Sequence, residues 1–369
     1  MKKKYLIFLV LIAQLTMIHA QSDSTILFKD GDGGYKAYRI PALLKTAKGT
    51  LLAFAEARWK GLDDAFDIDL VLRRSFDGGK TWQPTQMVWD DGENTCGNPV
   101  PVQDPTTGRI FLFMNWNYGP DEQDKIEAGT SQDTRRIYLC YSDDEGATWT
   151  KPEDLTTSLK NISNETWHGV GPCHGMVKTR EPHKGRIIIP VYYKNRQQRG
   201  YAHVFYSDDH GATWHRGHDC VPQLGCRQGS SESTVVELSD GRLYMSMRTV
   251  GPRDSVRHYA ISTDGGERWS NHLIDSTLYD PRCQAAITNA SMGMSGPTLL
   301  YLHQHHPTRR RDLTLSVSHN NGQTWDCSYY IHNDAAYCDL AMLNKKEVGV
   351  IYEADYYTKI VFKTILLSK

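Results

Sequence analysis

The sequence SFDGGKTW at residues 75–82 has four close copies further along the chain. They are SDDEGATW (142–149), SDDHGATW (207–214), STDGGERW (262–269) and SHNNGQTW (318–325). Successive copies start 67, 65, 55 and 56 residues apart. Self-similarity at a nearly constant period of this length indicates a repeat architecture, in which one unit cannot bury its own apolar face.

A short strand-like run precedes each copy and ends in the Ser of that copy. These runs are rich in β-branched and aromatic residues: DLVLRRS (69–75), IYLCYS (137–142), AHVFYS (202–207), HYAIS (258–262) and LTLSVS (313–318). The copy itself predicts a hairpin turn, because its Asp can accept backbone hydrogen bonds, its Gly permits positive φ and its Trp can pack back on the sheet. The fifth copy carries Asn320 instead of Asp, and Asn can also cap such a turn.

The remaining sequence predicts an all-β fold in one domain. Further strands are predicted at 50–57, 109–116, 186–193, 233–238, 242–248, 297–304, 347–354 and 359–366. A period near 60 residues leaves room for four strands in each unit, which is the size of a propeller blade. We therefore expect residues 21–369 to form a six-bladed β-propeller. Five blades carry the turn, and the two chain ends close the sixth.

The N-terminus has the layout of a secretory signal. MKKK is followed by an apolar run at 5–18 and by the small residue Ala20. This predicts a signal peptide at residues 1–20 and an exported protein, periplasmic or extracellular. An uncleaved anchor is the alternative, although the run is short for a bilayer span.

Composition excludes some classes of protein. The formal net charge is −1 and neither sign forms a long run, which argues against a nucleic-acid binder. The eight Cys match no zinc-site spacing, and an oxidising compartment would permit a small loop between Cys220 and Cys226.

The motif S-x-D-x-G-x-x-W is the Asp box, and with YRIPAL at 38–43 the chain resembles bacterial and animal exo-α-sialidases (neuraminidases) over about residues 38–353. The resemblance implies hydrolysis of terminal α-linked sialic acids on glycoproteins, glycolipids or oligosaccharides. It also implies that the Asp boxes lie away from the active site. The alternatives are a trans-sialidase, an enzyme that releases an anhydro sugar, a catalytically inactive sialoglycan-binding propeller, and an Asp-box propeller that acts as a receptor or on another glycan.

The resemblance places three arginines around the substrate carboxylate: Arg39, Arg248 and Arg310. Guanidinium groups suit this task because they stay charged and offer forked donors. Arg309 and Arg311 flank Arg310, so the sequence alone does not align one arginine with the family motif, and the family spacing selects Arg310. By the same resemblance, Glu353 pairs with Arg39 and Arg58 helps to hold the sugar.

The resemblance also supplies the reacting groups. A carboxylate nucleophile would be repelled by the carboxylate of sialic acid, and sialidases use Tyr instead. Here that Tyr is Tyr337, and Glu232 is the base that activates it. Asp64 is expected to be the acid and then the base, with Asp63 as the nearest rival, while Asp67 and Asp69 serve the following strand. No metal or organic cofactor is needed for these steps.

Further positions are expected to lie near the site. Tyr192 is a candidate for contact with the glycerol or N-acyl side chain of the sugar, with packing inside the blade as the alternative. The tract DPRCQAAI (280–287) is expected to act as scaffold. Cys173 in GPCHG (171–175) replaces a family Gly, which predicts an altered rim. The alignment of Glu122 and Glu127 with the family is left open.

Overall fold

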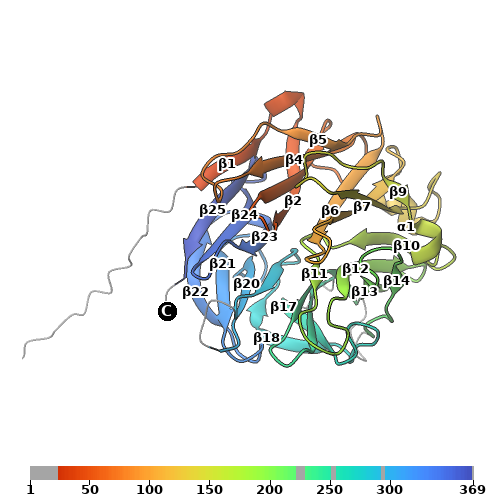
Figure 1. Ribbon diagram of the computed structural model, residues 1–369. Helices are drawn as coiled ribbons and strands as arrows, with labels where there is room; N and C mark the ends of the chain where they lie inside the picture. Colours follow the sequence, from red (N-terminus) through yellow and green to blue (C-terminus); the bar gives the residue numbers. More distant parts are fainter. Residues whose placement is uncertain (1–23, 222–228, 251–254, 292–295, 368–369) are drawn as a thin grey trace, which may run out of the picture.

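The computed structural model describes residues 24–221, 229–250, 255–291 and 296–367, and these form an all-β, propeller-like structure. Antiparallel sheets follow one another around a common centre (Figure 1). Residues 1–20, where the signal peptide is predicted, and Cys226 lie outside the described residues.

Four sheets are separate in their hydrogen bonding. Three of them have four strands each. The first consists of β1 (Ser24–Lys29), β25 (Lys359–Leu366), β24 (Glu347–Ala354) and β23 (Ala335–Met342), and the second of β15 (Ser230–Glu237), β16 (Leu243–Thr249), β17 (Val256–Ser262) and β18 (Leu273–Tyr279). The third consists of β19 (Ala286–Asn289), β20 (Leu299–Gln304), β21 (Leu313–Ser318) and β22 (Asp326–His332). The fourth contains β10 (Glu165–Val170), β11 (Met176–Val177), β12 (Ile187–Asn195), β13 (Gly200–Ser207) and β14 (His215–Arg216).

The fifth sheet has eight strands and consists of two antiparallel runs. The first run contains β2 (Ala37–Lys45), β3 (Leu51–Arg58), β4 (Ile68–Ser75) and β5 (Gln86–Trp89). The second contains β6 (Thr95–Gln103), β7 (Ile110–Asn117), β8 (Arg136–Ser142) and β9 (Glu153–Asp154). A single parallel bridge, Ile68 to Thr95, joins the two runs.

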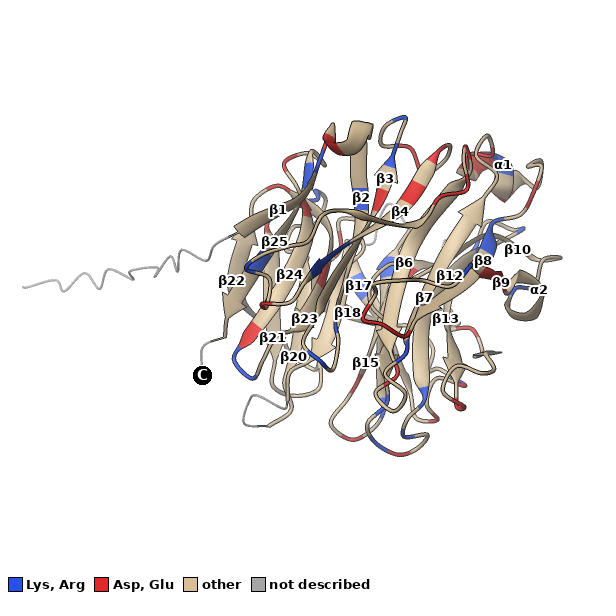
Figure 2. Cartoon of the chain, turned by 45° about the horizontal axis from the view of Figure 1, so that its top comes forward, with Lys and Arg blue, Asp and Glu red and all other residues tan. Residues whose placement is uncertain are grey.

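In the part of the chain that the structure describes, helical structure is confined to three short segments: η1 (Asp32–Gly34), α1 (Gln123–Ala128) and α2 (Thr156–Leu159). Within the described residues, no helix has the length and apolar character needed to span a membrane. Charged residues of both signs are distributed around the molecule, which fits the near-zero net charge (Figure 2).

The strands predicted beside and between the repeats all coincide with observed strands. The unpredicted strands are mostly the first strand of a run, such as β6, β10 and β19, or a very short last strand, such as β9 and β14. The first strands pack against one another around the centre, with β2 against β6 and β23, and β19 against β15 and β23. They carry Pro, Gly and polar residues, so they lack the apolar alternation that predicts a strand.

The two chain ends close the ring within one sheet. β1, from the N-terminal part, pairs antiparallel with β25, the last strand of the chain (red against blue in Figure 1). This confirms the expectation that both ends of the chain contribute to one sheet. β1 covers the outer edge of β25, whose backbone groups would otherwise be unpaired on that side.

All five repeats form the predicted turn. In the first, Ser75 Oγ donates to Asp77 Oδ1 at 2.9 Å and accepts from Gly79 N at 2.9 Å. Asp77 Oδ1 also accepts from Thr81 N at 2.9 Å. The other four copies repeat these three bonds, and Asn320 replaces the carboxylate in the fifth.

The Gly of each turn also sets the contact with the preceding run of strands. Its φ is positive in all five copies, and a Cβ on Gly79 would overlap the Phe362 ring of β25. In the same way Gly211 abuts Phe111 of β7, and Gly266 abuts Val204 of β13. Each turn therefore links one run of strands to the run before it, and the first turn links to the C-terminal sheet.

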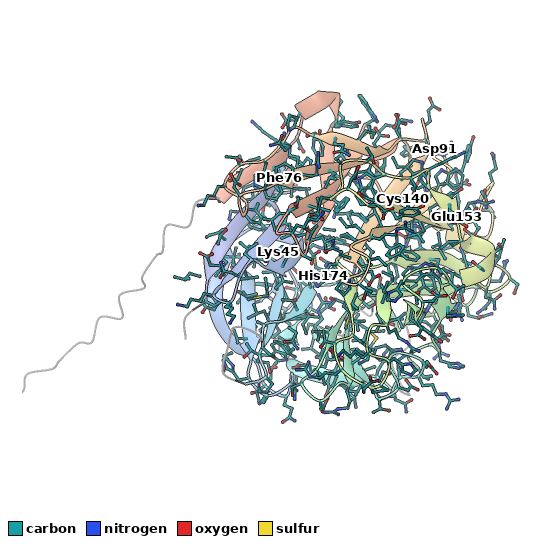
Figure 3. All side chains as sticks on the ribbon, in the orientation of Figure 1. Lys45, Phe76, Asp91, Cys140, Glu153 and His174 are labelled. Carbon is teal, nitrogen blue, oxygen red and sulfur yellow. The ribbon has the colours of Figure 1, made fainter. Side chains whose placement is uncertain are left out.

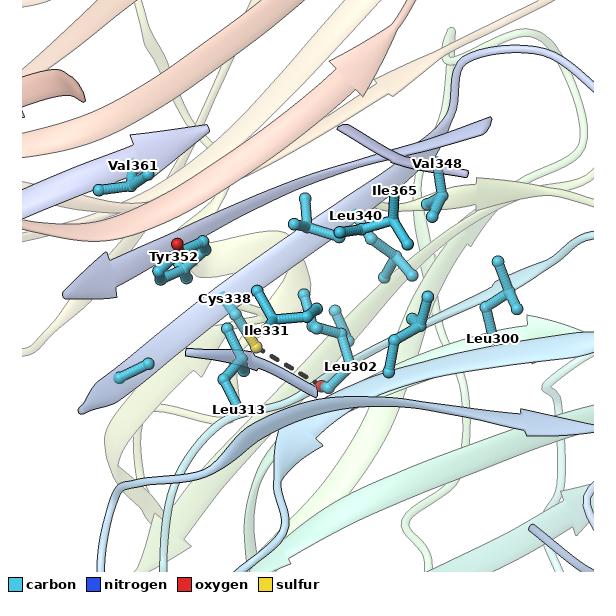
Figure 4. Packing of buried hydrophobic residues seen from close by; sticks show 14 of the residues in the cluster. Leu300, Leu302, Leu313, Ile331, Cys338, Leu340, Val348, Tyr352, Val361 and Ile365 are labelled. Carbon is cyan, nitrogen blue, oxygen red and sulfur yellow. Dashed lines mark hydrogen bonds between the residues drawn. The ribbon is translucent and has the colours of Figure 1, made fainter. Parts of the chain in front are cut away.

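Apolar side chains fill the spaces between neighbouring sheets. One cluster contains Leu302 of β20, Ile331 of β22, Leu340 of β23 and Val348 of β24, all of them buried. Figure 4 shows these side chains pointing toward one another between the two sheets. Burial of this kind is the main favourable contribution to folding and holds consecutive sheets together.

The third turn offers a stability test. Asp209 accepts hydrogen bonds from Ser207 Oγ, Thr213 N and Thr213 Oγ1. We expect Asp209→Ala to lower the free energy of unfolding by about 1–2 kcal/mol, the cost of lost hydrogen bonds at a partly exposed turn. Asp209→Asn should cost less, because Asn320 makes the equivalent bonds in the fifth copy. Urea denaturation measures both, and an Asn variant as unstable as the Ala variant would contradict this account.

Buried histidines predict a second stability effect. Burial lowers the pKa of His303 to about 3 and that of His272 to about 4, and it holds the pKa of His168 and His203 well below the usual value. The unfolded chain binds these protons near about pH 6.5, whereas the folded chain does not. Stability is therefore constant with respect to these groups above that pH and falls as the pH decreases below it.

We expect the melting temperature to fall as the pH is lowered from about 7 to about 5. Each such histidine reduces the free energy of unfolding by about 1.4 kcal/mol for every pH unit below its unfolded pKa. His303→Gln should make the fall shallower, because it removes one of the groups that must stay neutral. Thermal unfolding followed by circular dichroism provides the measurement. A melting temperature that is the same at both pH values would disprove the histidine explanation.

Candidate active site

One cavity of about 200 Å³ collects most of the predicted site residues. Its described lining includes Arg39, Arg58, Asp64, Tyr192, Glu232, Arg248, Arg310 and Tyr337. These residues come from widely separated parts of the chain, so only the closed ring of sheets brings them together. No residue of the five Asp boxes lines the described part of this cavity.

A register shift in the first strand of several runs aims side chains at the cavity. The shifts lie at 39–42 in β2, 97–100 in β6, 165–168 in β10, 230–233 in β15 and 335–338 in β23. Each irregularity contains or adjoins a cavity residue: Arg39, Asn98, Trp167, Glu232 and Tyr337. A bulge bends its strand and redirects side chains, and bulges often lie next to active sites.

Glu353 fixes Arg39, the first of three arginines (Arg39, Arg248 and Arg310) that are called the clamp arginines below. Arg39 Nε donates to Glu353 Oε1 at 2.8 Å, and Arg39 Nη2 donates to Oε2 at 3.3 Å. The carboxylate also accepts the backbone N–H groups of Ile40 at 2.9 Å and Tyr337 at 3.1 Å. The predicted pair of Arg39 and Glu353 is therefore present in the structure, with Glu353 fully buried behind the cavity.

Tyr337, Glu232 and Arg248 form a hydrogen-bonded trio. The Tyr337 hydroxyl donates to Glu232 Oε1 and accepts from Arg248 Nη1 at 3.0 Å, and Arg248 Nη1 also donates to Glu232 Oε2 at 2.5 Å. Burial, and then the charge of Glu232, raise the pKa of Tyr337 well above its usual value. The phenol is thus protonated at rest and aimed at a carboxylate that can take its proton, which is the geometry of an activated nucleophile.

Arg310 completes a convergent group of guanidiniums. It lies over the Tyr337 ring, with Cζ 5.4 Å from the ring centroid, and Arg39 lies over the same ring at 5.2 Å. Arg310 Nη2 donates to the Arg282 carbonyl at 2.9 Å. Two guanidiniums over the Tyr337 ring and a third at its hydroxyl offer forked donors for a bound anion such as a carboxylate.

Asp64 lies on the loop after β3 and is held by arginines. Arg58 Nη2 donates to Asp64 Oδ1 at 2.7 Å, and Arg39 Nη1 lies 3.9 Å from the same oxygen. Burial raises the pKa of Asp64, but Arg58 and Arg39 outweigh it and lower this pKa to about 2. Asp63 contributes only its carbonyl oxygen, to Arg58 at 2.9 Å, so the structure brings Asp64 and not this rival to the clamp.

The far end of the cavity contains residues that sequence reasoning did not select. Arg135 is buried, lies over the Trp167 ring at 3.8 Å and donates through Nη2 to Asn98 Oδ1 at 3.2 Å. Among the described residues, its Nε and Nη1 find no hydrogen-bond partner. Tyr192 lies in the same region, where it is buried and packed against Trp167. This fits the alternative of packing inside the blade, and Tyr192 also lines the cavity.

Glu56 is a further unselected residue. It is buried beneath Arg58, accepts from Arg58 Nε at 3.0 Å and accepts the backbone N–H of Asn98 at 2.8 Å. The position of Glu56 two residues before Arg58 on one face of β3 is the signal that sequence analysis could have used. For Arg135 the sequence offers no such signal, because it is one of two adjacent arginines in a polar stretch.

The expectation for Cys173 was wrong. Cys173 is fully buried in the apolar cluster with Leu300 and Leu302 and contributes nothing to a rim. The neighbouring His174 lies near the centre of the molecule (Figure 3), where its Nδ1 is 2.6 Å from Asp339 Oδ1. The replacement of Gly by Cys is therefore accommodated in the core, with φ at 150°.

The remaining expected positions serve as support. In the tract 280–287, Asp280 accepts the backbone N–H groups of Thr249 and Cys283, and Cys283 packs against Tyr337. Glu127 of α1 pairs with Lys194 at 2.7 Å behind the cavity. Glu122 lies at the start of α1, outside the lining.

Comparison with known proteins identifies the family. Residues 49–352 match the model of the BNR repeat-like domain. The sialidase of Bacteroides fragilis is 28% identical over 88% of this chain, and the chain spans 61% of that protein's length. Among solved structures, the Hadza microbial sialidase Hz136 has a TM-score of 0.82 and 28% identity, covering 91% of this chain and 67% of that one.

The leech intramolecular trans-sialidase shares the fold, with a TM-score of 0.80 and 19% identity over 94% of this chain and 70% of that one. The family match covers most of the chain and includes all five Asp boxes. The chain belongs to the sialidase family that carries BNR repeats.

Proposed function

We propose that the protein is an exo-α-sialidase that removes terminal sialic acids from glycoconjugates with retention of configuration. The observation that carries this proposal is the hydrogen-bonded trio of Tyr337, Glu232 and Arg248 inside the arginine-lined cavity. Binding of a sialoglycan would not by itself require a protonated phenol aimed at a buried carboxylate. This arrangement therefore favours catalysis over a binding propeller.

In the first step, Arg39, Arg248 and Arg310 hold the substrate carboxylate and so place the anomeric carbon near Tyr337. The Tyr337 oxygen attacks that carbon while its proton passes to Glu232. The glycosidic C–O bond breaks, and Asp64 gives a proton to the departing oxygen. A glycosyl–tyrosine intermediate results, with Glu232 protonated and Asp64 ionised.

In the second step, water attacks the same carbon and gives its proton to Asp64. The bond to Tyr337 breaks, and the phenolate regains the proton that Glu232 held. Two displacements at one carbon restore the starting configuration. Asp64 and Glu232 end in their starting protonation states, so the cycle is balanced without a cofactor.

The proposal extends to the architecture and location of the protein. We count the eight-stranded sheet as two blades, because one parallel bridge alone joins its halves, and this gives six blades in residues 21–369. We also propose that residues 1–20 are removed on export to the periplasm or the medium. The mass of the exported chain, which should begin at Gln21, provides the check.

The catalytic proposal predicts the behaviour of two tyrosines in one cavity. Tyr337→Phe should reduce turnover of a fluorogenic α-sialoside at least about 1000-fold, because the nucleophilic oxygen is lost. Tyr192→Phe is the matched control and should lose less than about tenfold, because among the described residues Glu232 accepts hydrogen bonds from Tyr337 and Arg248 and not from Tyr192. Melting temperatures should show that both variants are folded.

A folded wild type without turnover would contradict the enzyme proposal, and an unimpaired Tyr337→Phe would contradict the mechanism alone. Proton NMR of the first product then separates the remaining alternatives. The proposal requires the free sugar acid to appear as the α anomer. An anhydro sugar, or transfer to added lactose in place of hydrolysis, would identify one of the related activities instead.

Arg135 predicts an effect on substrate binding. Its unpartnered Nε and Nη1 are buried beside the cavity, where a bare cation is unfavourable unless a bound group supplies acceptors. We expect Arg135→Met to raise KM about tenfold with a smaller change in kcat, because its hydrogen bond within the described residues goes to Asn98 and not to Tyr337 or Asp64. Arg136→Met is the control, because Arg136 pairs instead with Asp133 and Asp154. Equal KM values for the two variants would refute the role of Arg135.

A further inference from the structure

The turn between β24 and β25 has an unusual backbone. Asp355, Tyr356 and Tyr357 have φ values of 51°, 57° and 68°, so three consecutive non-glycine residues are left-handed. Such conformations are unfavourable for bulky side chains and tend to occur where function requires a fixed geometry. Asp355 anchors the turn through His332 at 2.8 Å and Lys359 at 2.6 Å.

The two tyrosines of this turn have opposite surroundings. Tyr356 is 82% exposed. Tyr357 is packed against the cluster that contains Tyr337 and Ile40. The left-handed turn thus directs one aromatic ring outward and the next one inward.

Tyr357 contacts two of the three clamp arginines. The Arg39 guanidinium lies over the Tyr357 ring, with Cζ 4.7 Å from the centroid. Arg310 Nη1 donates to the Tyr357 hydroxyl at 3.3 Å. Tyr357 is not part of the described lining of the cavity, and it lines a separate small pocket together with Arg310 and Glu353.

One hairpin therefore holds Arg39 in two ways. Glu353, on β24, binds the guanidinium edge, and Tyr357, four residues later, covers its face. Arg39 and Arg310 carry like charges and repel each other, and within the described residues Arg310 donates to a phenol and a carbonyl oxygen and pairs with no carboxylate. An aromatic face attracts a cation, and a phenol oxygen accepts from one, so a single side chain can hold both guanidiniums.

We propose that Tyr357 is a positioning residue that sets the spacing of Arg39 and Arg310, so that both can bind one substrate carboxylate. The left-handed turn keeps the ring in this place. The inference rests on the proposed function of the clamp but concerns binding of a carboxylate, whether or not turnover follows.

The test measures binding and kinetics in the full chain. The probe for binding is the non-hydrolysed 2,3-dehydro analogue of sialic acid, followed by titration calorimetry. Tyr357→Asn removes the ring with a residue that tolerates the left-handed conformation, and Tyr357→Phe keeps the ring but removes the hydroxyl. Tyr356→Ala is the matched control in the same turn.

We expect Tyr357→Asn to weaken binding of the analogue about 30-fold and to raise KM by a similar factor, with a smaller fall in kcat. Tyr357→Phe should recover most of the loss, to within about threefold of wild type, because it keeps the cation–π contact. Tyr356→Ala should bind like the wild type, because the Tyr356 side chain is largely exposed to solvent.

A purely structural role would lower the melting temperature of Tyr357→Asn and leave the Kd and KM of the folded protein unchanged, and this result would overturn the proposal. So would Tyr356→Ala binding as weakly as Tyr357→Asn, because the turn and not the ring would then be responsible. A wild type that binds the analogue without hydrolysing sialosides would reject the catalytic proposal while the Kd values still decide the role of Tyr357. A folded wild type that does not bind the analogue would overturn both.

Discussion

The ion pair between Arg39 and Glu353 joins residues 314 positions apart, and the closed fold and the site both depend on it. Glu353 also accepts the backbone N–H groups of Ile40 and Tyr337, so one buried carboxylate fixes Arg39 and the strand that carries Tyr337, the proposed nucleophile. A carboxylate buried this deeply is unfavourable unless a cation and hydrogen-bond donors satisfy it. Here β2 supplies that cation from the opposite end of the chain, so closing the ring and assembling the site are linked.

The bulges in the first strands explain how a regular fold presents an irregular set of side chains. A strand without a bulge alternates its side chains between two sheet faces, and in a propeller both faces pack against neighbouring sheets. The register shifts at 39–42, 230–233 and 335–338 release Arg39, Glu232 and Tyr337 from that alternation. Their side chains can then point along the centre of the ring, where several runs of strands meet.

The sequence predicted the repeated part of the molecule well, because the Asp box is a local structure whose hydrogen bonds lie within eight residues. The main site residues could be placed only by resemblance to a family, since no local pattern connects Arg39 to Tyr337. Neither a local pattern nor the resemblance to a family selected Arg135 and Asn98, because these residues are placed by contacts between different runs of strands. Cys173 was misplaced for the same reason: a substitution in a motif does not reveal whether its side chain faces the site or the core.

The charge of the cavity links substrate binding to acid catalysis. Among its described lining residues, six are cationic (Arg39, Arg58, Arg135, Lys194, Arg248 and Arg310) and three are carboxylates (Glu56, Asp64 and Glu232). The excess suits an anionic substrate, but it also keeps the pKa of Asp64 low, so Asp64 is ionised while the clamp is empty. A substrate carboxylate bound by Arg39 would offset part of that positive charge and thereby raise the pKa of Asp64. In the proposed mechanism, Asp64 must be protonated before it can donate a proton to the departing oxygen. Its pKa therefore rises toward the range in which it holds a proton only when a substrate is present to receive that proton.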